Sequence, residues 1–294
     1  MGAMTTALLD PLAPSEDGVW SCAGVQVRRR RNPHHRHAAQ TATCTTRFCV
    51  QRYGAVLLVD HDLTPDELSD DLAVLLADEL VDSGVLRGQT EFELVFTGVV
   101  RSTVVGGLAS WSRFYRNSVA RLEEGTAAFA PIHAFAAGQV RGRQVIDLGS
   151  CFGFFPLRLA QQGFDVLATD LSAPVMCLLA EMSTAMRRPL HTLVCDAADV
   201  TLPDGCADTV SVLHLIEHLP TTSITAVLDE AVRLARRRVI VAVPYEAEPR
   251  ACYGHVQRFD SAALHALATA TCSAHPGLTA RVHDHHGGWL ILDR

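Results

Sequence analysis

Two stretches of the sequence combine residue types that could carry out chemistry. Val145–Phe155 reads V-I-D-L-G-S-C-F-G-F-F, an apolar run followed by an acid and a loop with glycines four apart. Val210–Pro220 reads V-S-V-L-H-L-I-E-H-L-P and brings two imidazoles close to a carboxylate. A strand that leads into a glycine loop and a helix is typical of nucleotide-like ligand sites. Imidazoles beside a carboxylate can move a proton or bind a metal ion.

The elements around both stretches predict an α/β fold with a parallel sheet. From Arg143 onward, apolar runs alternate with helical patterns, as in parallel strands joined by helices. The expected strands are Val145–Leu148, Asp165–Thr169, Leu190–Cys195, Asp208–Leu213 and Arg238–Val243. Gly287-Gly288 then separates Thr279–His285 from Trp289–Asp293, which predicts an antiparallel hairpin at the end of the sheet. Parallel strands end at one edge, so both reactive stretches should face the same ligand.

The chain before Arg143 has a different character. We expect a loose tail over residues 1–18, a small α+β domain over 19–137 and a catalytic domain over 138–294. In the second of these, Thr46–Asp60 and Glu91–Val105 read as strands and Trp111–Leu122 reads as a helix. With no catalytic motif of its own, this domain is predicted to shape or cover a substrate site.

One helix start in this region is sharply marked. Thr64-Pro65-Asp66-Glu67 offers an N-cap, a proline at the first helical position and a capping-box glutamate. Leucines from Leu68 to Leu80 recur at helical spacing, and Gly84 can end the helix.

Composition limits the classes of function. The chain has 294 residues, is 48% hydrophobic and carries a formal charge of −7, which argues against nucleic acid as the main partner. It contains no lysine, so Schiff-base and P-loop lysine chemistry are excluded. The nine cysteines form no C-x-x-C pair, so we expect neither a disulfide framework nor a zinc cage, and predict a cytoplasmic protein. No apolar run approaches the roughly 20 residues of a membrane span.

A basic run from Arg28 to Arg31 continues into His34, His35 and His37. It could bind phosphate or a metal ion, but the histidine spacing fits no zinc pattern. A solvated loop between two strands is the simpler interpretation.

The glycine loop and the closing hairpin resemble the class I S-adenosylmethionine-dependent methyltransferases over about Arg143–Arg294. The family loop reads D-x-G-x-G-x-G, and here Asp147, Gly149 and Gly153 match while Cys151 stands at the middle glycine. The resemblance implies a Rossmann-like fold and S-adenosylmethionine as cofactor. It also implies that Asp170 binds the ribose hydroxyls and that Asp196 binds the adenine amino group. The residues expected at the cofactor are Asp147, Gly149, Ser150, Cys151, Gly153, Asp170, Leu171, Asp196, Ala197 and His214.

Two competing interpretations fit less well. A dinucleotide-binding dehydrogenase needs G-x-G-x-x-G, and this loop has only the first glycine and one four positions later. The pattern H-x-x-E-H also describes inverzincin metalloproteases, which need it on one long helix. Here it follows a strand, and Pro220 delays the next helix.

The same pattern is similar to E-x-x-E-H in magnesium-dependent methyltransferases of the quinone-biosynthesis and small-RNA 2′-hydroxyl groups. His214 replaces the first glutamate, and His255 lies where those proteins have a later histidine. The resemblance implies that Glu217, His218 and His255 hold a divalent cation that polarises a hydroxyl. Alternatively, His218 or His255 acts directly as the base. The replacement by His214 makes the site less suited to magnesium. A polar loop that merely covers the cofactor remains open.

At nearly full length the chain resembles the mycofactocin oligosaccharide methyltransferases. The residues that carry this resemblance are Asp147–Ala160, Val210–Pro220 and Pro244–Asp260. It implies methyl transfer to a glucose hydroxyl on the sugar chain of that peptide-derived redox cofactor, and therefore a glycosylated partner. Two alternatives stay open: an RNA 2′-O-methyltransferase, and an inactive methyltransferase fold that serves as a binding subunit.

Overall fold

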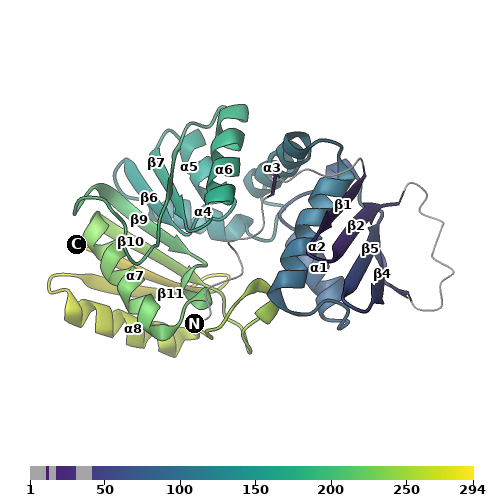
Figure 1. Cartoon of the computed structure of the whole chain (residues 1–294). Coiled ribbons are helices and arrows are strands. Elements are labelled where there is room, and N and C mark those ends of the chain that lie inside the picture. The colour runs from purple at the N-terminus through teal and green to yellow at the C-terminus, as the bar shows by residue number, and fades with distance from the viewer. Residues whose placement is uncertain (1–10, 13–17, 31–41) are drawn as a thin grey trace. The chain divides into compact units, whose positions relative to one another are not determined.

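The computed structural model describes residues 11–12, 18–30 and 42–294 (Figure 1). The chain forms two compact units. The first ends at Ala128 and also takes in Ala251–Tyr253, and the second comprises Phe129–Arg250 and Gly254–Arg294. We expected the boundary between residues 137 and 138. It falls earlier because helix α4 (Ala130–Gln139) packs Ile132 and Ala136 into a core of the second unit.

A seven-stranded sheet organises the second unit, in the order β11-β12-β10-β9-β6-β7-β8. The strands are β6 (Gln144–Leu148), β7 (Asp165–Asp170), β8 (His191–Val194), β9 (Ala207–Leu213), β10 (Ala235–Val243), β11 (Thr279–Asp284) and β12 (Gly288–Asp293). Strands β6 to β10 pair in parallel, and β12 is antiparallel to both β10 and β11. The predicted parallel strands and the closing hairpin are confirmed.

Helices cover both faces of this sheet, because its central strands are apolar on both sides. Alternate residues divide between the faces: Val239 and Val241 belong to one core and Ile240 to the other. Helices α7 (Thr221–Leu234) and α8 (Ser261–Ala274) line the first core, while α4 and α5 (Phe154–Gln161) line the second. Helix α6 (Ala173–Ala185) packs against β7 and β8. The predicted Rossmann-like α/β fold is confirmed.

The first unit is a smaller α+β unit, as predicted. Its five-stranded sheet has the order β1-β2-β5-β4-β3. The strands are β1 (Val19–Cys22), β2 (Val25–Arg29), β3 (Thr43–Cys44), β4 (Phe48–Tyr53) and β5 (Val56–His61). The predicted strand region Thr46–Asp60 is thus the β4–β5 hairpin. Two long helices follow, α2 (Gly88–Thr103) and α3 (Gly107–Glu124), and α3 confirms the predicted helix Trp111–Leu122.

The predicted strand Glu91–Val105 is wrong, since these residues belong mostly to helix α2. The run E-F-E-L-V-F-T-G-V-V is rich in β-branched and aromatic residues, which favour strands. In the structure, every residue from Leu94 to Thr103 is buried. A helix buried on all sides has no polar face, so its sequence lacks the helical period that would have identified it.

The helix predicted after Thr64 forms in interrupted pieces. The capping box is present, with the Glu67 carboxylate accepting from the Thr64 backbone N–H at 2.8 Å. A single 3-10 turn, η2 (Pro65–Glu67), follows, and then α1 (Leu72–Leu76) and a π-helical turn, η3 (Ala77–Val81). The predicted start is therefore confirmed, whereas the continuous helix from Leu68 to Leu80 is wrong.

Two predictions for the first unit are corrected: that its cysteines stay unpaired, and that the basic run is a solvated loop, since Arg28 and Arg29 lie in β2. Cys44 and Cys49, directly opposite each other on β3 and β4, form a disulfide that we did not expect. In the basic run, Arg28 pairs with the Asp60 carboxylate at 2.6 Å, inside the unit's own sheet. Residues 31–41, including the histidine tract, lie outside the described residues.

In the ranges that the structure describes, no single helix is long and apolar enough to cross a membrane. Helices α2 and α3, taken as a pair bent by 103°, meet the length and composition criteria together.

Candidate active site

Asp147 organises the glycine loop from the end of β6. It is 3% exposed, and its two carboxylate oxygens accept hydrogen bonds from the hydroxyls of Ser211 (2.5 Å) and Ser150 (2.7 Å). Burial raises the pKa of Asp147 to about 6, although these two hydroxyls oppose the shift. Ser150 also receives the backbone N–H of Thr169 on β7. Asp147 thus joins three strands beneath the loop, and a direct contact with the cofactor stays a prediction.

Two glycines of the loop are required by their surroundings. Gly149 and Gly153 have φ of +72° and +71°, the left-handed region that favours glycine. A Cβ atom at Gly153 would lie 2.4 Å from the Leu179 side chain of α6. Gly153 is also the N-cap of α5, so the loop passes directly into a helix N-terminus, where backbone N–H groups favour an anionic or polar ligand group.

Cys151 adopts the glycine-like conformation without being glycine. Its φ is +49°, and its backbone N–H donates to a carboxylate oxygen of Asp170 at 2.9 Å. The other Asp170 oxygen accepts from the Ser172 backbone N–H, also at 2.9 Å. Cys151 thus takes a backbone conformation that favours glycine, and its main chain connects the loop to the acid predicted to bind ribose.

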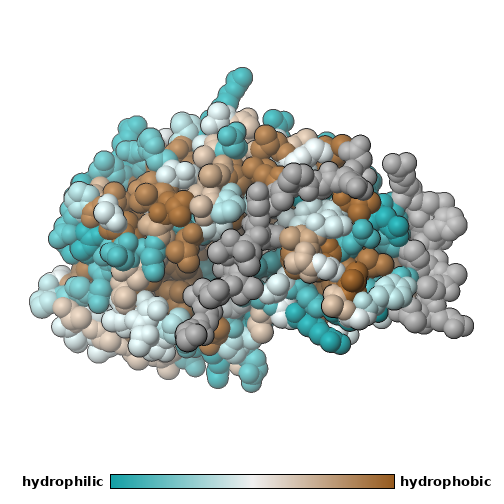
Figure 2. All heavy atoms as spheres, viewed as in Figure 1, coloured by the Kyte–Doolittle hydropathy of each residue, from teal (hydrophilic) through white to brown (hydrophobic). Residues whose placement is uncertain are grey.

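The remaining predicted cofactor residues lie at the same carboxyl edge of the sheet. Asp196 is exposed after β8, with Oδ1 accepting from the Ala198 N–H at 2.9 Å, and Ala197 is half-buried beside it. Leu171, next to Asp170, is 68% exposed. Figure 2 shows hydrophobic and hydrophilic residues intermixed on the visible face of this unit. An exposed leucine beside an acid suits a ligand with an apolar ring and hydroxyl groups.

The second reactive stretch adjoins the glycine loop. A Cβ atom at Gly149 would meet the side chain of Leu215 at 2.7 Å, so the loop passes directly over the segment that carries Glu217. His214 begins this segment with φ of +52°, and its ring packs edge-on against Phe129 with centroids 5.3 Å apart. The predicted cofactor contact of His214 is untested.

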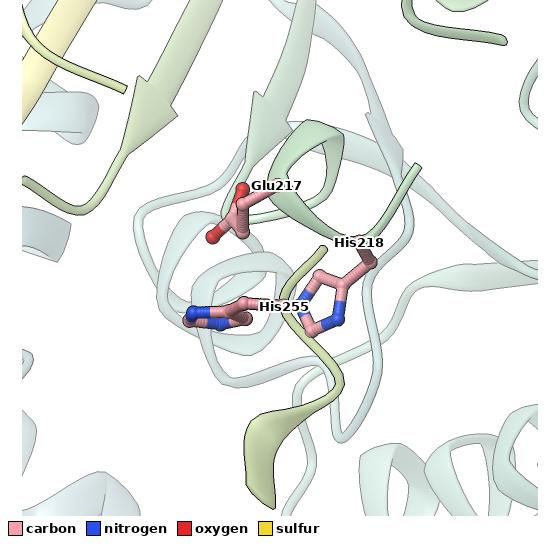
Figure 3. A group of neighbouring side chains, drawn as sticks. All are labelled: Glu217, His218 and His255. Atoms are coloured by element: carbon pink, nitrogen blue, oxygen red, sulfur yellow. The ribbon is translucent and has the colours of Figure 1, made fainter. Parts of the chain in front are cut away.

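Glu217, His218 and His255 come together as predicted (Figure 3). One potential ligand atom from each lies within 4.8 Å of the other two. Glu217 and His218 belong to a single 3-10 turn, η4 (Ile216–His218), and His255 approaches from the segment after Gly254. The two imidazole rings are nearly perpendicular, with centroids 4.8 Å apart. A three-residue turn is not the long helix that a metalloprotease requires, which removes that interpretation.

Main-chain hydrogen bonds hold the two segments together. The carbonyl oxygen of Glu217 accepts from the backbone N–H groups of Val256 (2.8 Å) and Gln257 (3.0 Å). The two residues after His255 are therefore bonded to the Glu217 main chain, and this fixes the position of His255 independently of its side chain.

The carboxylate of Glu217 is buried without a hydrogen bond. Glu217 is 0% exposed, and neither of its carboxylate oxygens accepts a hydrogen bond. His214 Nδ1 lies 3.2 Å from Oε1, but the contact does not have hydrogen-bond geometry. Burial lowers the pKa of His218; the nearby Glu217 carboxylate opposes this shift, and His255 adds to it. His218 is therefore predominantly neutral at pH 7 and can accept a proton or bind a cation.

Glu246 is a member of the site that we did not predict. Its carboxylate lies 2.9 Å from His255 Nδ1 and also accepts from the Arg250 backbone N–H at 3.2 Å. The His255 and Glu246 side chains are only 9% and 16% exposed. A single glutamate nine positions before a histidine carries no recognisable motif. Only the proximity of both residues to the end of β10 could have suggested the pair.

Chemically, this edge of the sheet can hold a nucleoside and activate a hydroxyl beside it. The glycine loop, the N-terminus of α5 and the acids Asp170 and Asp196 suit the nucleoside. Glu217, His218 and His255 supply a base or a set of metal ligands next to Leu215, which touches the loop.

Comparisons with known proteins agree with this arrangement. Residues 146–243 match the family model described as "Methyltransferase domain". A search of curated proteins finds no significant match.

Solved structures with related folds are distant. A protein from Pyrococcus horikoshii is 16% identical with a TM-score of 0.48, over 58% of this chain and 91% of that one. Magnesium protoporphyrin IX methyltransferase from Synechocystis, with bound S-adenosylmethionine, is 20% identical with a TM-score of 0.44, over 65% and 85%. At such values these likenesses carry no information about substrate.

The family match covers β6 to β10, the strands whose carboxyl ends carry the glycine loop, the acids and the histidines. The strand order and the single reversed strand fit the same class. Residues 146–243 of the second unit therefore match a methyltransferase domain, and the unit has the Rossmann-like fold of the class I methyltransferases.

Proposed function

We propose that the protein transfers the methyl group of S-adenosylmethionine to a sugar hydroxyl, specifically a glucose hydroxyl of a mycofactocin-type oligosaccharide. The observation that supports an oxygen acceptor is the Glu217, His218 and His255 cluster beside the glycine loop. A sugar hydroxyl has a pKa far above 7, so its oxygen needs a base or a cation to become an effective nucleophile.

In the proposed reaction, the hydroxyl oxygen attacks the methyl carbon in line with the carbon–sulfur bond. The O–H proton passes to His218 or His255, a C–O bond forms and the C–S bond breaks. The products are a methyl ether, S-adenosylhomocysteine and one proton. The protein's contribution is to align the oxygen with the methyl group and to stabilise the developing charge on both partners.

The sugar acceptor rests on the resemblance over Pro244–Asp260, which includes Glu246 and His255. The RNA alternative drew support from the basic run at Arg28–Arg31. Arg28 pairs with Asp60, and Arg30 donates to the Arg47 carbonyl and to Asp62, so these two arginines already have partners within their own unit. This favours the sugar over RNA. The cytoplasmic location and the covering role of the first unit stay predictions.

The test is mass spectrometry after incubation with S-adenosylmethionine that carries an isotopically labelled methyl group. An oligosaccharide extract should gain one labelled methyl group on a hexose-bearing species, and an RNA pool should gain none. Glu217→Gln is the matched inactive variant.

Label on RNA ribose alone would establish the RNA activity instead. An absence of cofactor binding in calorimetry, unchanged by Asp170→Ala, would identify an inactive binding subunit.

A further inference from the structure

The buried carboxylate of Glu217 needs an electrostatic partner. A fully buried carboxylate without hydrogen bonds is strongly destabilising, because it has lost its hydration and gained nothing in return. Within the described part of the chain, no arginine pairs with Glu217, and His214 Nδ1 at 3.2 Å makes no hydrogen bond with it. A cation bound next to the carboxylate would supply the missing compensation.

The neighbouring imidazoles are prepared to bind that cation. The His218 and His255 rings lie with centroids 4.8 Å apart, and each offers a ring nitrogen to the space beside the Glu217 carboxylate. His255 Nδ1 lies 2.9 Å from the Glu246 carboxylate, and in the neutral tautomer with the hydrogen on Nδ1 this nitrogen donates to Glu246. Its Nε2 then keeps a lone pair. A carboxylate that orients a histidine in this way is the usual outer partner of a metal-binding imidazole.

The spacing of the three groups suits one ion. Two atoms that bind the same zinc ion at about 2.0–2.2 Å cannot be more than about 4.4 Å apart. The three potential ligand atoms lie within 4.8 Å of one another, so a small closure brings them into range. The Glu217 carbonyl, which holds Val256 and Gln257, keeps the two segments at this spacing.

We propose that the metal site that the resemblance implies at Glu217, His218 and His255 takes a first-row transition-metal ion of the zinc type in place of magnesium, with Glu246 as the positioning residue for His255. The inference deepens the proposed function and rests on it for the ion's purpose, which is to polarise the acceptor hydroxyl. Metal binding itself is measured separately from methyl transfer.

The donor set selects the kind of ion. Two imidazoles and one carboxylate suit zinc, cobalt, manganese or iron, whereas magnesium prefers oxygen ligands in a near-octahedral arrangement. Three protein ligands also leave a position open for a substrate oxygen, as in catalytic zinc sites. His214 is not one of the three residues, although its Nδ1 lies 3.2 Å from Glu217 Oε1. When bound, the ion would supply Lewis-acid polarisation of the hydroxyl. His218 and His255 would then use their lone pairs for the ion, and the hydroxyl proton would leave to solvent instead of to either imidazole.

The test uses the full-length protein after removal of metal with a chelator. The parent carries His34→Ala, His35→Ala and His37→Ala, so that this tract cannot capture the ion. Equilibrium dialysis against Zn²⁺, Co²⁺ and Mg²⁺ should give one tight equivalent of Zn²⁺ or Co²⁺ and much weaker Mg²⁺. Bound Co²⁺ should absorb visible light in the way that is typical of cobalt with a low coordination number.

Variants assign the ligands. Glu217→Gln and His255→Ala should abolish tight binding, and Glu246→Gln should weaken it by about 10- to 100-fold. Asp229→Asn is the control, because Asp229 pairs with His275 Nε2 at 2.7 Å on the surface and should leave binding unchanged. Circular dichroism confirms that each variant is folded.

Two results would overturn the proposal: no tight binding of Zn²⁺ or Co²⁺ by the parent, or binding that Glu217→Gln leaves unchanged. Methyl transfer that persists at full rate without metal, but fails in Glu217→Gln, would show direct base catalysis instead. If the ion binds as expected and no sugar is methylated, the metal site stands and the proposed acceptor is wrong.

Discussion

Two buried carboxylates lie at one edge of the sheet, Asp147 and Glu217, and they differ in whether their oxygens accept hydrogen bonds. Asp147 is fully buried, and both of its oxygens are hydrogen-bonded by the hydroxyls of Ser150 and Ser211. Glu217 is at least as buried, and neither of its oxygens is hydrogen-bonded. A buried carboxylate with both oxygens hydrogen-bonded fixes the positions of the segments around it, whereas one without hydrogen bonds is held in place by the surrounding fold and is available to a ligand. The glycine loop is thus held in place by the first carboxylate, and we expect the chemistry at the second.

The largest effect should come from neutralising Glu217. Glu217→Gln keeps the shape of the side chain and removes its charge, so methyl transfer should fall by about 100-fold or more. The metal-free variant should be as stable as the wild type or more so, because an uncompensated buried charge has been removed. Single-turnover assays and thermal melts measure the two quantities on the same samples. A clear loss of stability would mean that Glu217 is a structural partner of His214.

Asp147→Ala should differ from Glu217→Gln in that its main effect is a loss of stability. Removing the carboxylate leaves the hydroxyls of Ser150 and Ser211 with only their longer bonds to the main-chain carbonyls of Asp147 (3.1 Å) and Ile146 (3.4 Å). We expect a loss of about 1–3 kcal/mol in the free energy of unfolding. Urea denaturation measures this loss. Cofactor affinity, followed by calorimetry, should fall with it. An unchanged stability would remove the distinction between the two carboxylates.

The raised pKa of Asp147 predicts a smaller effect, a dependence of folding stability on pH. Burial raises it to about 6, above its value of roughly 4 in the unfolded chain. The folded state therefore binds more protons than the unfolded state between pH 4 and 6, so this group's contribution to stability declines as the pH rises through that window. The stability of the wild type relative to Asp147→Asn should fall from pH 4 to pH 6 and level off above it. A difference that rises with pH would contradict the raised pKa.

Cys151→Gly should produce the smallest change, and in the stabilising direction. Cys151 has φ of +49°, which costs a non-glycine residue about 1–2 kcal/mol, while glycine adds roughly 0.5–1 kcal/mol of unfolded-state entropy. A net gain of about 0.5–1 kcal/mol should appear as a slightly higher melting temperature. A decrease would indicate that the thiol makes a stabilising contact of its own.

The methyltransferase domain was predictable from sequence because its signals are local. Buried parallel strands read as continuous apolar runs, and each is followed by the loop that carries a functional residue. Gly149, Gly153 and Asp170 could be located by spacing alone. The cluster of Glu217 and His218 with His255 was found through family resemblance, since His255 lies 37 positions after His218 in the sequence.

The failures have physical causes as well. Helix α2 was taken for a strand because burial on every side erased its period. The Cys44–Cys49 disulfide was missed because the absence of a C-x-x-C pair says nothing about two cysteines opposite each other across a tight hairpin. Glu246 was missed because its role depends on a distance of 2.9 Å to His255, which only the folded loop defines.

The two hydrogen bonds from Val256 and Gln257 to the Glu217 carbonyl have a consequence for how this site can change. They connect main-chain atoms, and so they survive replacement of any of the three reactive side chains. The fold can therefore exchange one set of side chains for another while the spacing between the two segments is kept. Such a site is open to divergence, in nature or in the laboratory, toward other acceptors and other ions without rebuilding the scaffold.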